Sequence, residues 1–204
     1  MPFALLHWKR IRPSRKINKV NRSLRKIQIV FDSVQGVEGG LKLSRLFCRQ
    51  LNDNQLSGTI PAEPGKLEHL FELNLANNQL EGPIPHNISS CTALNQLNLS
   101  KNNFKGRIPN ELGRIINLNT LDLSDNNFSG AVPTSIGDLE HLLTLNLSRN
   151  HLYRPLPAKF GNLRSMQTMD ISFNSLCSSI PAEMGQLQNI MSLYKFIVLL
   201  FPYG

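Results

Sequence analysis

The side chains that could do chemistry in this 204-residue chain are few and widely scattered. A catalytic nucleophile needs a nearby base, and a zinc site needs paired ligands at short spacing. The cysteines (Cys48, Cys91, Cys177) and histidines (His7, His69, His86, His141, His151) show neither pattern. We therefore expect no catalytic residues, no metal site and no cofactor, and we expect Cys91 to be a buried small hydrophobe.

The residues that do stand at a regular spacing are six asparagines, each 24 residues after the last: Asn54, Asn78, Asn102, Asn126, Asn150 and Asn174. A side-chain amide both donates and accepts hydrogen bonds. Where the chain turns inward, such an amide can satisfy backbone groups of its own turn and of the adjacent one. We call these six residues the asparagine ladder.

The frame around each ladder residue is Leu-x-Leu-x-x-Asn-x-Leu, and an Ile-Pro pair or its equivalent follows. Self-similarity at a period of roughly 20–29 residues is typical of a leucine-rich-repeat solenoid. We predict an α/β repeat fold, a right-handed solenoid of about six turns. Each Leu-x-Leu would form a short parallel strand on the concave face, with its leucines inward. The proline ends pairing on the convex side, and a helical half-turn closes each turn.

The predicted organisation has four parts: residues 1–40 form a basic leader, 41–50 a degenerate partial repeat, 51–192 the solenoid and 193–204 an apolar tail. Residues 1–50 hold twelve of the 22 basic residues, so the net charge of +8 belongs to this end and the repeats are near neutral. Pro64 replaces an inward apolar residue, so we expect that half-turn to be broken. The first and last turns should be the loosest.

The leader repeats apolar residues at spacings of three and four between basic ones, which predicts a basic amphipathic helix. Such a helix could lie on an anionic membrane, bind an acidic partner, act as a nuclear-import signal or pack over the first turn. The alternative is untranslated or intronic sequence read as protein. We expect neither a secretory signal nor a membrane span, because no apolar run approaches ~18 residues.

The hybrid frame LxLxxNxLxGxIPxxLGxLxxL resembles the plant class of leucine-rich repeats found in receptor-like kinases. More narrowly, residues 50–192 resemble the ectodomain of the ERECTA and ERECTA-like receptor kinases. The stretches that carry this resemblance are Leu51-Asn-Asp-Asn-Gln-Leu, Phe71-Glu-Leu-Asn-Leu-Ala-Asn-Asn, Ile88-Ser-Ser-Cys-Thr-Ala-Leu94 and Gly137-Asp-Leu-Glu-His-Leu-Leu143.

The resemblance implies a plasma-membrane glycoprotein in signal transduction, facing the cell exterior. Its partners would be a secreted cysteine-rich peptide or a second repeat receptor, and its roles growth and stomatal patterning. No kinase motif is present, so we expect a non-enzymatic partial ectodomain, from a truncated gene or a partial gene model. Two rivals stay open: an incomplete record of a full-length serine/threonine receptor kinase, and an intracellular scaffold targeted by its leader. We expect no nucleic-acid partner, and membrane contact only through missing family segments or the leader.

Outward residues of the strands and their following turns form the candidate concave binding face: Asn98, Lys101, Asp122, Asp125, Asn146, Arg149, His151, Asp170 and Phe173. The alternative is a solvated face without a partner. A flat footprint of ~400 Å² follows from the strand spacing, against ~800 Å² per partner in stable interfaces. Asn-x-Ser sequons give candidate glycosylation at Asn87, Asn98, Asn127 and Asn146, besides Asn21 in the leader.

Overall fold

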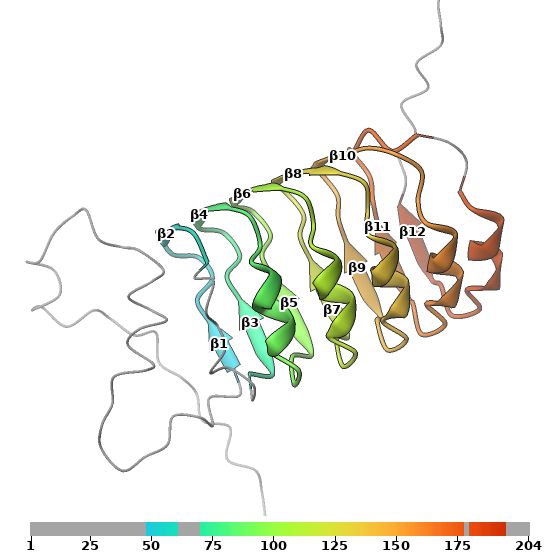
Figure 1. The fold of residues 1–204 in the computed structure, drawn as a ribbon, viewed down its shortest axis with the longest axis horizontal. Coiled ribbons are helices and arrows are strands. Elements are labelled where there is room, and N and C mark those ends of the chain that lie inside the picture. Colours follow the sequence, from blue (N-terminus) through green and yellow to red (C-terminus); the bar gives the residue numbers. More distant parts are fainter. Residues whose placement is uncertain (1–47, 61–69, 178–179, 195–204) are drawn as a thin grey trace, which may run out of the picture.

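The computed structural model describes residues 48–60, 70–177 and 180–194. The leader, Pro64, most of the tail, His7, Asn21 and His69 lie outside these ranges, so the predictions for them stay predictions. The described chain is a right-handed stack of similar turns, as Figure 1 shows, and the predicted repeat solenoid with parallel strands is confirmed.

The main sheet has seven parallel three-residue strands in chain order, which we call the front sheet. Neighbouring strands pair with a register shift of 24 residues, for example Thr120 opposite Thr144. In chain order the strands are β1 Cys48–Gln50, β3 Glu72–Asn74, β5 Gln96–Asn98, β7 Thr120–Asp122, β9 Thr144–Asn146, β11 Thr168–Asp170 and β12 Ser192–Tyr194. β1 falls in the segment predicted as a degenerate repeat, and β12 reaches past residue 192.

A second, five-stranded parallel sheet lies beyond the turn that follows each front strand. It contains β2 Ser57–Gly58, β4 Gln79–Gly82, β6 Asn103–Gly106, β8 Asn127–Gly130 and β10 His151–Leu152. This sheet was not predicted from the sequence. β4 and β8 alternate more exposed and buried residues, and β2, β4, β6 and β8 each end on a glycine with positive φ.

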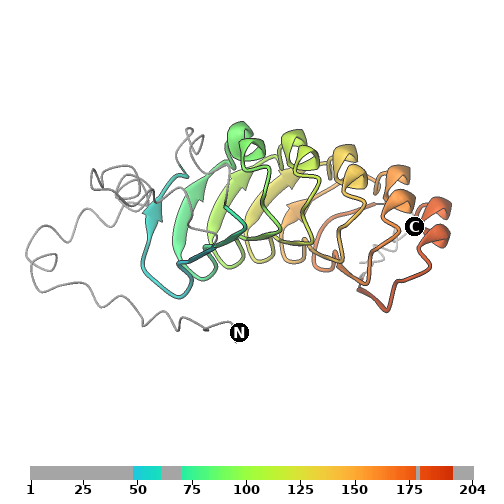
Figure 2. The same cartoon turned by 90° about the horizontal axis from the view of Figure 1, so that it is seen from below.

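The turns from residue 72 onward close through a five-residue 3₁₀ helix that begins after the frame's proline, and Figure 2 shows these helices in a row along one side of the stack. They are η3 His86–Ser90, η4 Asn110–Arg114, η5 Thr134–Asp138, η6 Ala158–Asn162 and η7 Ala182–Gln186. Proline supplies the extended residue before the helix, with φ near −65°. The apolar residue in the middle of each helix, such as Ile136 or Phe160, then points into the core.

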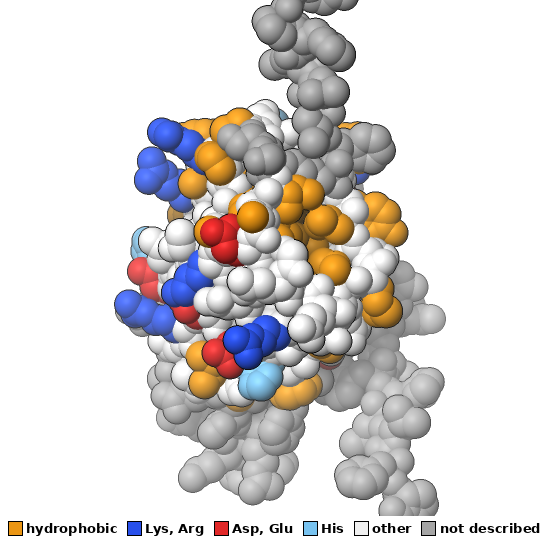
Figure 3. Space-filling model, turned by 90° about the vertical axis from the view of Figure 1, so that its right-hand side faces the viewer, with side chains coloured by type: hydrophobic (Ala, Val, Ile, Leu, Met, Phe, Trp, Pro, Cys, Tyr) orange, Lys and Arg blue, Asp and Glu red, His pale blue; other side chains and the backbone are white. Residues whose placement is uncertain are grey.

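The core is one continuous column of leucines, isoleucines and phenylalanines between the two sheets and the 3₁₀ helices. Phe104 and Phe128 occupy the same place in successive turns, and their rings stack with centroids 6.1 Å apart. At the C-terminal end the column is less covered: Leu193 is 38% exposed, whereas its counterpart Leu145 is fully buried. Apolar side chains gather on this end of the molecule (Figure 3).

Candidate functional site: the outer face of the front sheet

The asparagine ladder lies just after the front strands, and its hydrogen bonds join neighbouring turns. Asn126 donates from Nδ2 to the carbonyls of Leu123 and Ser124 in its own turn and of Leu99 in the preceding one, at 3.0–3.2 Å. Its Oδ1 accepts from the backbone N–H of Phe104 at 3.0 Å. Asn78, Asn102, Asn150 and Asn174 repeat the pattern. Asn54, in the first described turn, is exposed, and among the described residues it donates to the Leu51 and Asn52 carbonyls of its own turn.

Four residues of the candidate face occupy the outward position of a front strand: Asn98, Asp122, Asn146 and Asp170. Each is half-buried, and its Oδ1 accepts from the backbone N–H and the hydroxyl of the serine two residues later. For Asp122 these distances are 3.0 and 2.7 Å. Either asparagine or aspartate can occupy this position, because the turn needs only the Oδ1 acceptor that both side chains carry. The sequence could not reveal this local role, which leaves only part of each side chain for a partner.

Lys101, Asp125, Arg149 and Phe173 occupy the next outward position, where the chain leaves the strand. All four adopt a left-handed backbone conformation, with φ between 51° and 53°. Asp53 and Asn77 hold the same place in the two earlier turns, with φ of 55° and 54°. We call these six residues the left-handed column. Each of the first five sends its backbone N–H to a carbonyl of the next turn, at 2.9–3.0 Å.

The C-terminal part of this column is charged and aromatic. The Arg149 guanidinium carbon lies 4.3 Å from the centroid of the Phe173 ring, and Arg149 Nε lies 3.7 Å from Asp125 Oδ1. Phe173 is nevertheless 51% exposed. A left-handed conformation costs a bulky L-residue roughly 1–2 kcal/mol, whereas asparagine tolerates it best. The exposed His151 follows in β10, so the structure brings Asp125, Arg149, His151 and Phe173 to one edge of the face.

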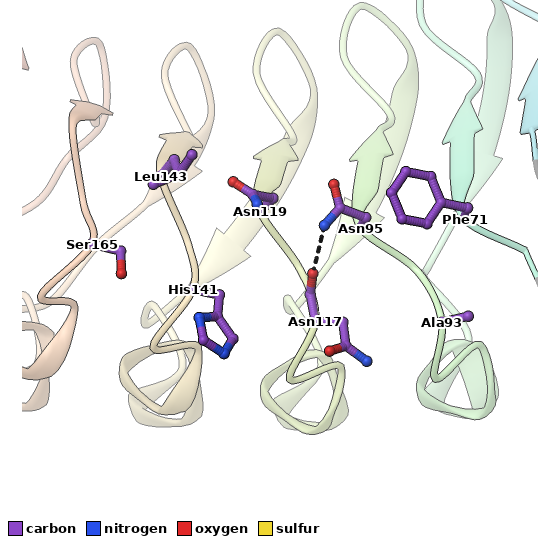
Figure 4. Close-up of a pocket in the computed structure, with 8 residues that line it drawn as sticks. All are labelled: Phe71, Ala93, Asn95, Asn117, Asn119, His141, Leu143 and Ser165. Carbon is purple, nitrogen blue, oxygen red and sulfur yellow. Dashed lines mark hydrogen bonds between the residues drawn. The ribbon is translucent and has the colours of Figure 1, made fainter. Parts of the chain in front are cut away.

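The opposite edge of the face, before the front strands begin, carries an open hollow of about 470 Å³ that the sequence analysis missed. Phe71, Asn95, Asn119 and Leu143 form one row along it, and Ala93, Asn117, His141 and Ser165 form a second (Figure 4). The signal in the sequence was apolar Phe71 and Leu143 at a frame position that holds asparagine in the two turns between them.

Other polar groups described by the structure lie away from this face. His86 Nδ1 contacts Glu111 Oε2 at 2.9 Å between η3 and η4, and this hydrogen bond is the main reason that the pKa of Glu111 is lowered. Burial raises the pKa of the Cys91 thiol to about 11, which suits a core residue. Within residues 48–60, 70–177 and 180–194 no group of three His, Cys, Asp or Glu side chains could hold a metal ion. No helix in those ranges is long and apolar enough to cross a bilayer.

The four sequons within the described residues differ in accessibility. Asn98 and Asn146 are half-buried on front strands, and each accepts hydrogen bonds from the serine of its own sequon. Asn87 is exposed on η3, and Asn127 is exposed at the start of β8. The structure therefore separates two sequons on the front face from two outside it.

Two kinds of known protein are similar to this chain. The plant peptide hormone receptor RGFR1 in complex with RGF2 superposes with a TM-score of 0.73 at 32% identity, over 76% of this chain and 25% of the receptor. PEPR1 in complex with AtPEP1 gives 0.72 at 36% identity, over 75% and 21%. The Arabidopsis receptor kinase HAESA, in complex with the peptide hormone IDA and the co-receptor SERK1, gives 0.56 at 30% identity, over 73% and 29%.

Among curated proteins, the chain is 93% identical over 39 residues to Protein NLP9 and to Protein NLP8 of Arabidopsis thaliana. That stretch is 19% of this chain and 4% of either relative, so it is too short to show membership of their family. The chain likewise spans only about a quarter of the RGFR1 chain.

The family model described as a leucine-rich repeat region matches residues 67–198, which is most of the chain and includes both edges of the front face. With its stacked 24-residue turns and its likeness to plant receptor ectodomains, the chain belongs to the leucine-rich-repeat family.

Proposed function

We propose that this chain is a non-catalytic peptide-recognition module, the partial ectodomain of a receptor kinase of the ERECTA type. It would face the cell exterior at the plasma membrane and bind a secreted cysteine-rich peptide. The observation that supports this most is the likeness to the RGFR1 and PEPR1 ectodomains at 32–36% identity, since both of those proteins were solved with a peptide bound.

The left-handed column and the neighbouring His151 in β10 supply the contact residues in this proposal. An exposed aromatic ring held by a cation is a common form of binding anchor. Phe173 also keeps a bulky side chain where asparagine would be less strained. Strain retained at an exposed residue points to a role outside folding. Arg149, His151 and Phe173 would meet the peptide, with Asp125 orienting Arg149.

A second leucine-rich-repeat receptor is the alternative partner. The HAESA structure includes both a peptide and the co-receptor SERK1. The exposed apolar residues at the C-terminal end, Met191, Leu193 and Tyr194, would suit such a protein surface better than a small peptide. This alternative predicts that the chain binds a receptor ectodomain even after the left-handed column is changed.

Binding of the full 204-residue chain to a panel of refolded, secreted cysteine-rich peptides tests the proposal by biolayer interferometry. We expect at least one peptide to bind below about 10 µM, which corresponds to a binding free energy of roughly −7 kcal/mol. Arg149→Ala and Phe173→Asn should each weaken binding about tenfold. Phe173→Asn copies Asn77, so it should not destabilise the fold.

Lys159→Ala is the matched control, because Lys159 pairs with Asp138 among the 3₁₀ helices, away from the front face. It should leave binding unchanged. If no peptide binds at 100 µM, or if Lys159→Ala weakens binding as much as Arg149→Ala does, the proposal is wrong.

A further inference from the structure

The spacing of the lining residues sets the length of the hollow at the start of the front strands. Its first row runs from Phe71 to Leu143 across three steps between adjacent turns (Figure 4). Backbone bonds of 2.7–2.8 Å join each member of the row to the next: Asn95 to Phe71, Asn119 to Asn95 and Leu143 to Asn119. Each step is therefore a strand spacing of ~4.8 Å, and the two apolar ends lie ~14 Å apart.

Four residues of an extended peptide span the same length. Strand residues rise ~3.4 Å each, so residues i and i+4 lie ~14 Å apart and point to the same side. Phe71 is 43% exposed and Leu143 is half-buried, so both present apolar surface to the hollow. Two apolar side chains of a bound strand, four residues apart, would reach Phe71 and Leu143 together.

Two asparagines lie between the apolar ends. Asn95 Nδ2 donates to the Asn117 carbonyl at 3.0 Å, which orients this amide and leaves its Oδ1 as an acceptor. The half-buried Asn119 side chain makes no hydrogen bond to the other described residues. Side-chain amides carry the donor and acceptor pair that a peptide backbone needs.

The charge of the hollow also restricts its occupant. None of its eight lining residues is Asp, Glu, Lys or Arg, whereas the left-handed column at the other edge carries Asp125 and Arg149. A charged side chain seated here would lose hydration without gaining a partner. The three middle residues of an occupant should therefore be small or polar and uncharged.

We infer that the hollow binds an extended, uncharged peptide segment with apolar residues at positions i and i+4. The backbone between these residues would bond to Asn95 and Asn119, and the apolar side chains would rest on Phe71 and Leu143. The inference rests on the proposed peptide-binding function and adds a second contact and a sequence preference to it.

The probe is a capped nine-residue peptide of Gly, Ser and Thr with Leu at its third and seventh positions. The control peptide has the same composition with Leu at its third and sixth positions. Each is titrated into the ¹⁵N-labelled full chain and followed by NMR. We expect the first peptide to shift the side-chain amide signals of Asn95 and Asn119, with an affinity at least threefold higher than that of the control.

Leu143→Asn and Phe71→Asn provide matched variants, because asparagine occupies this frame position in Asn95 and Asn119 without disturbing the fold. Each should weaken binding of the i, i+4 peptide at least threefold, while Arg149→Ala should not. Equal affinity for both peptides, no effect of Leu143→Asn, or shifts confined to another surface would overturn the inference.

The cysteine-rich panel separates the two failures. If a panel peptide binds through Arg149 and Phe173 while the i, i+4 peptide leaves Asn95 and Asn119 unshifted, this inference is wrong and the proposed function stands. If neither kind of peptide binds, both are wrong.

Discussion

At the scale of single residues, the same few hydrogen-bond patterns recur in successive turns, while the other side chains differ from turn to turn. The ladder asparagine uses both atoms of its amide, so no apolar residue of similar size can replace it. The outward aspartate or asparagine of each front strand uses one oxygen, so either residue is accepted there. The left-handed column joins successive turns through its backbone N–H groups, so the identity of its side chains can differ from turn to turn.

This difference gives a residue-scale prediction about the ladder. Asn126→Leu should lower the free energy of unfolding by about 3 kcal/mol, because it leaves the buried N–H of Phe104 without its acceptor and removes one of the two side-chain donors to the Leu99 carbonyl. Asn54→Leu should cost less than about 1 kcal/mol, since Asn54 is exposed and its hydrogen bonds to described residues stay within its own turn. Urea denaturation of the two variants measures the contrast. Equal losses would show that the amide does not join the turns.

Cysteine reactivity is a second test at this scale. Cys91 is fully buried with a pKa raised to about 11, so only about 0.1% of it would be thiolate at pH 8. Its alkylation by iodoacetamide in the native chain should be slow, and it should rise steeply only as the pH approaches 11 or the chain unfolds. Cys177 is exposed and should react readily. Peptide mapping by mass spectrometry resolves the two sites, and rapid native labelling of Cys91 would contradict the packing described.

At the scale of elements, the sequence was enough to predict the turns but not all of their parts. A 24-residue period with inward leucines permits only a stack, and the strand register follows from the period. The second sheet was not predicted, because its two- to four-residue strands are too short for alternation to stand out. The structural role of Asp122 was also missed, since it depends on the local backbone conformation that brings Ser124 to its Oδ1. The hollow beside Asn119 was missed because it depends on how successive turns lie against one another.

The close packing of neighbouring 3₁₀ helices gives an element-scale prediction. A Cβ added to Gly137 in η5 would lie 2.6 Å from the Lys159 carbonyl oxygen of η6. Gly137→Ala should therefore destabilise the chain by about 1–3 kcal/mol. Gly185 holds the same place in η7, where no atom of the described residues lies within 4 Å of an added Cβ, so Gly185→Ala should be neutral or stabilise by up to about 1 kcal/mol. The melting temperatures of both variants, measured by thermal unfolding, test this difference in stability. Equal changes in the two variants would exclude contact between successive 3₁₀ helices.

At the scale of the whole molecule, the stack separates a structural side from a display side. The 3₁₀ helices pack together along one side, while the front sheet presents an edge with charged and aromatic residues and an edge with a neutral hollow. Stability in such arrays comes mainly from contacts between neighbouring turns. Outward residues of the front sheet can therefore change with little cost to the fold, which suits a recognition surface.

Glycosylation gives a prediction at this scale. If the chain is directed through a secretory pathway by an added signal sequence, we expect glycans at Asn87 and Asn127, which are exposed outside the front sheet. Asn98 and Asn146 should be modified least, because their side chains are bonded to Ser100 and Ser148. Enzymatic deglycosylation in heavy-oxygen water followed by mass spectrometry gives the occupancy. Full occupancy at Asn98 and Asn146 would be incompatible with a front face open to a peptide.

The most direct test of the central claim is a hydroxyl-radical footprint of the full chain with and without a bound panel peptide. The reporters are Phe71 and Phe173 at the two edges of the front face, and His86 among the 3₁₀ helices. We predict that the peptide protects Phe173, with or without Phe71, and leaves the oxidation of His86 unchanged. Protection of His86 with Phe71 and Phe173 still fully oxidised would place the peptide on the other side and contradict this account.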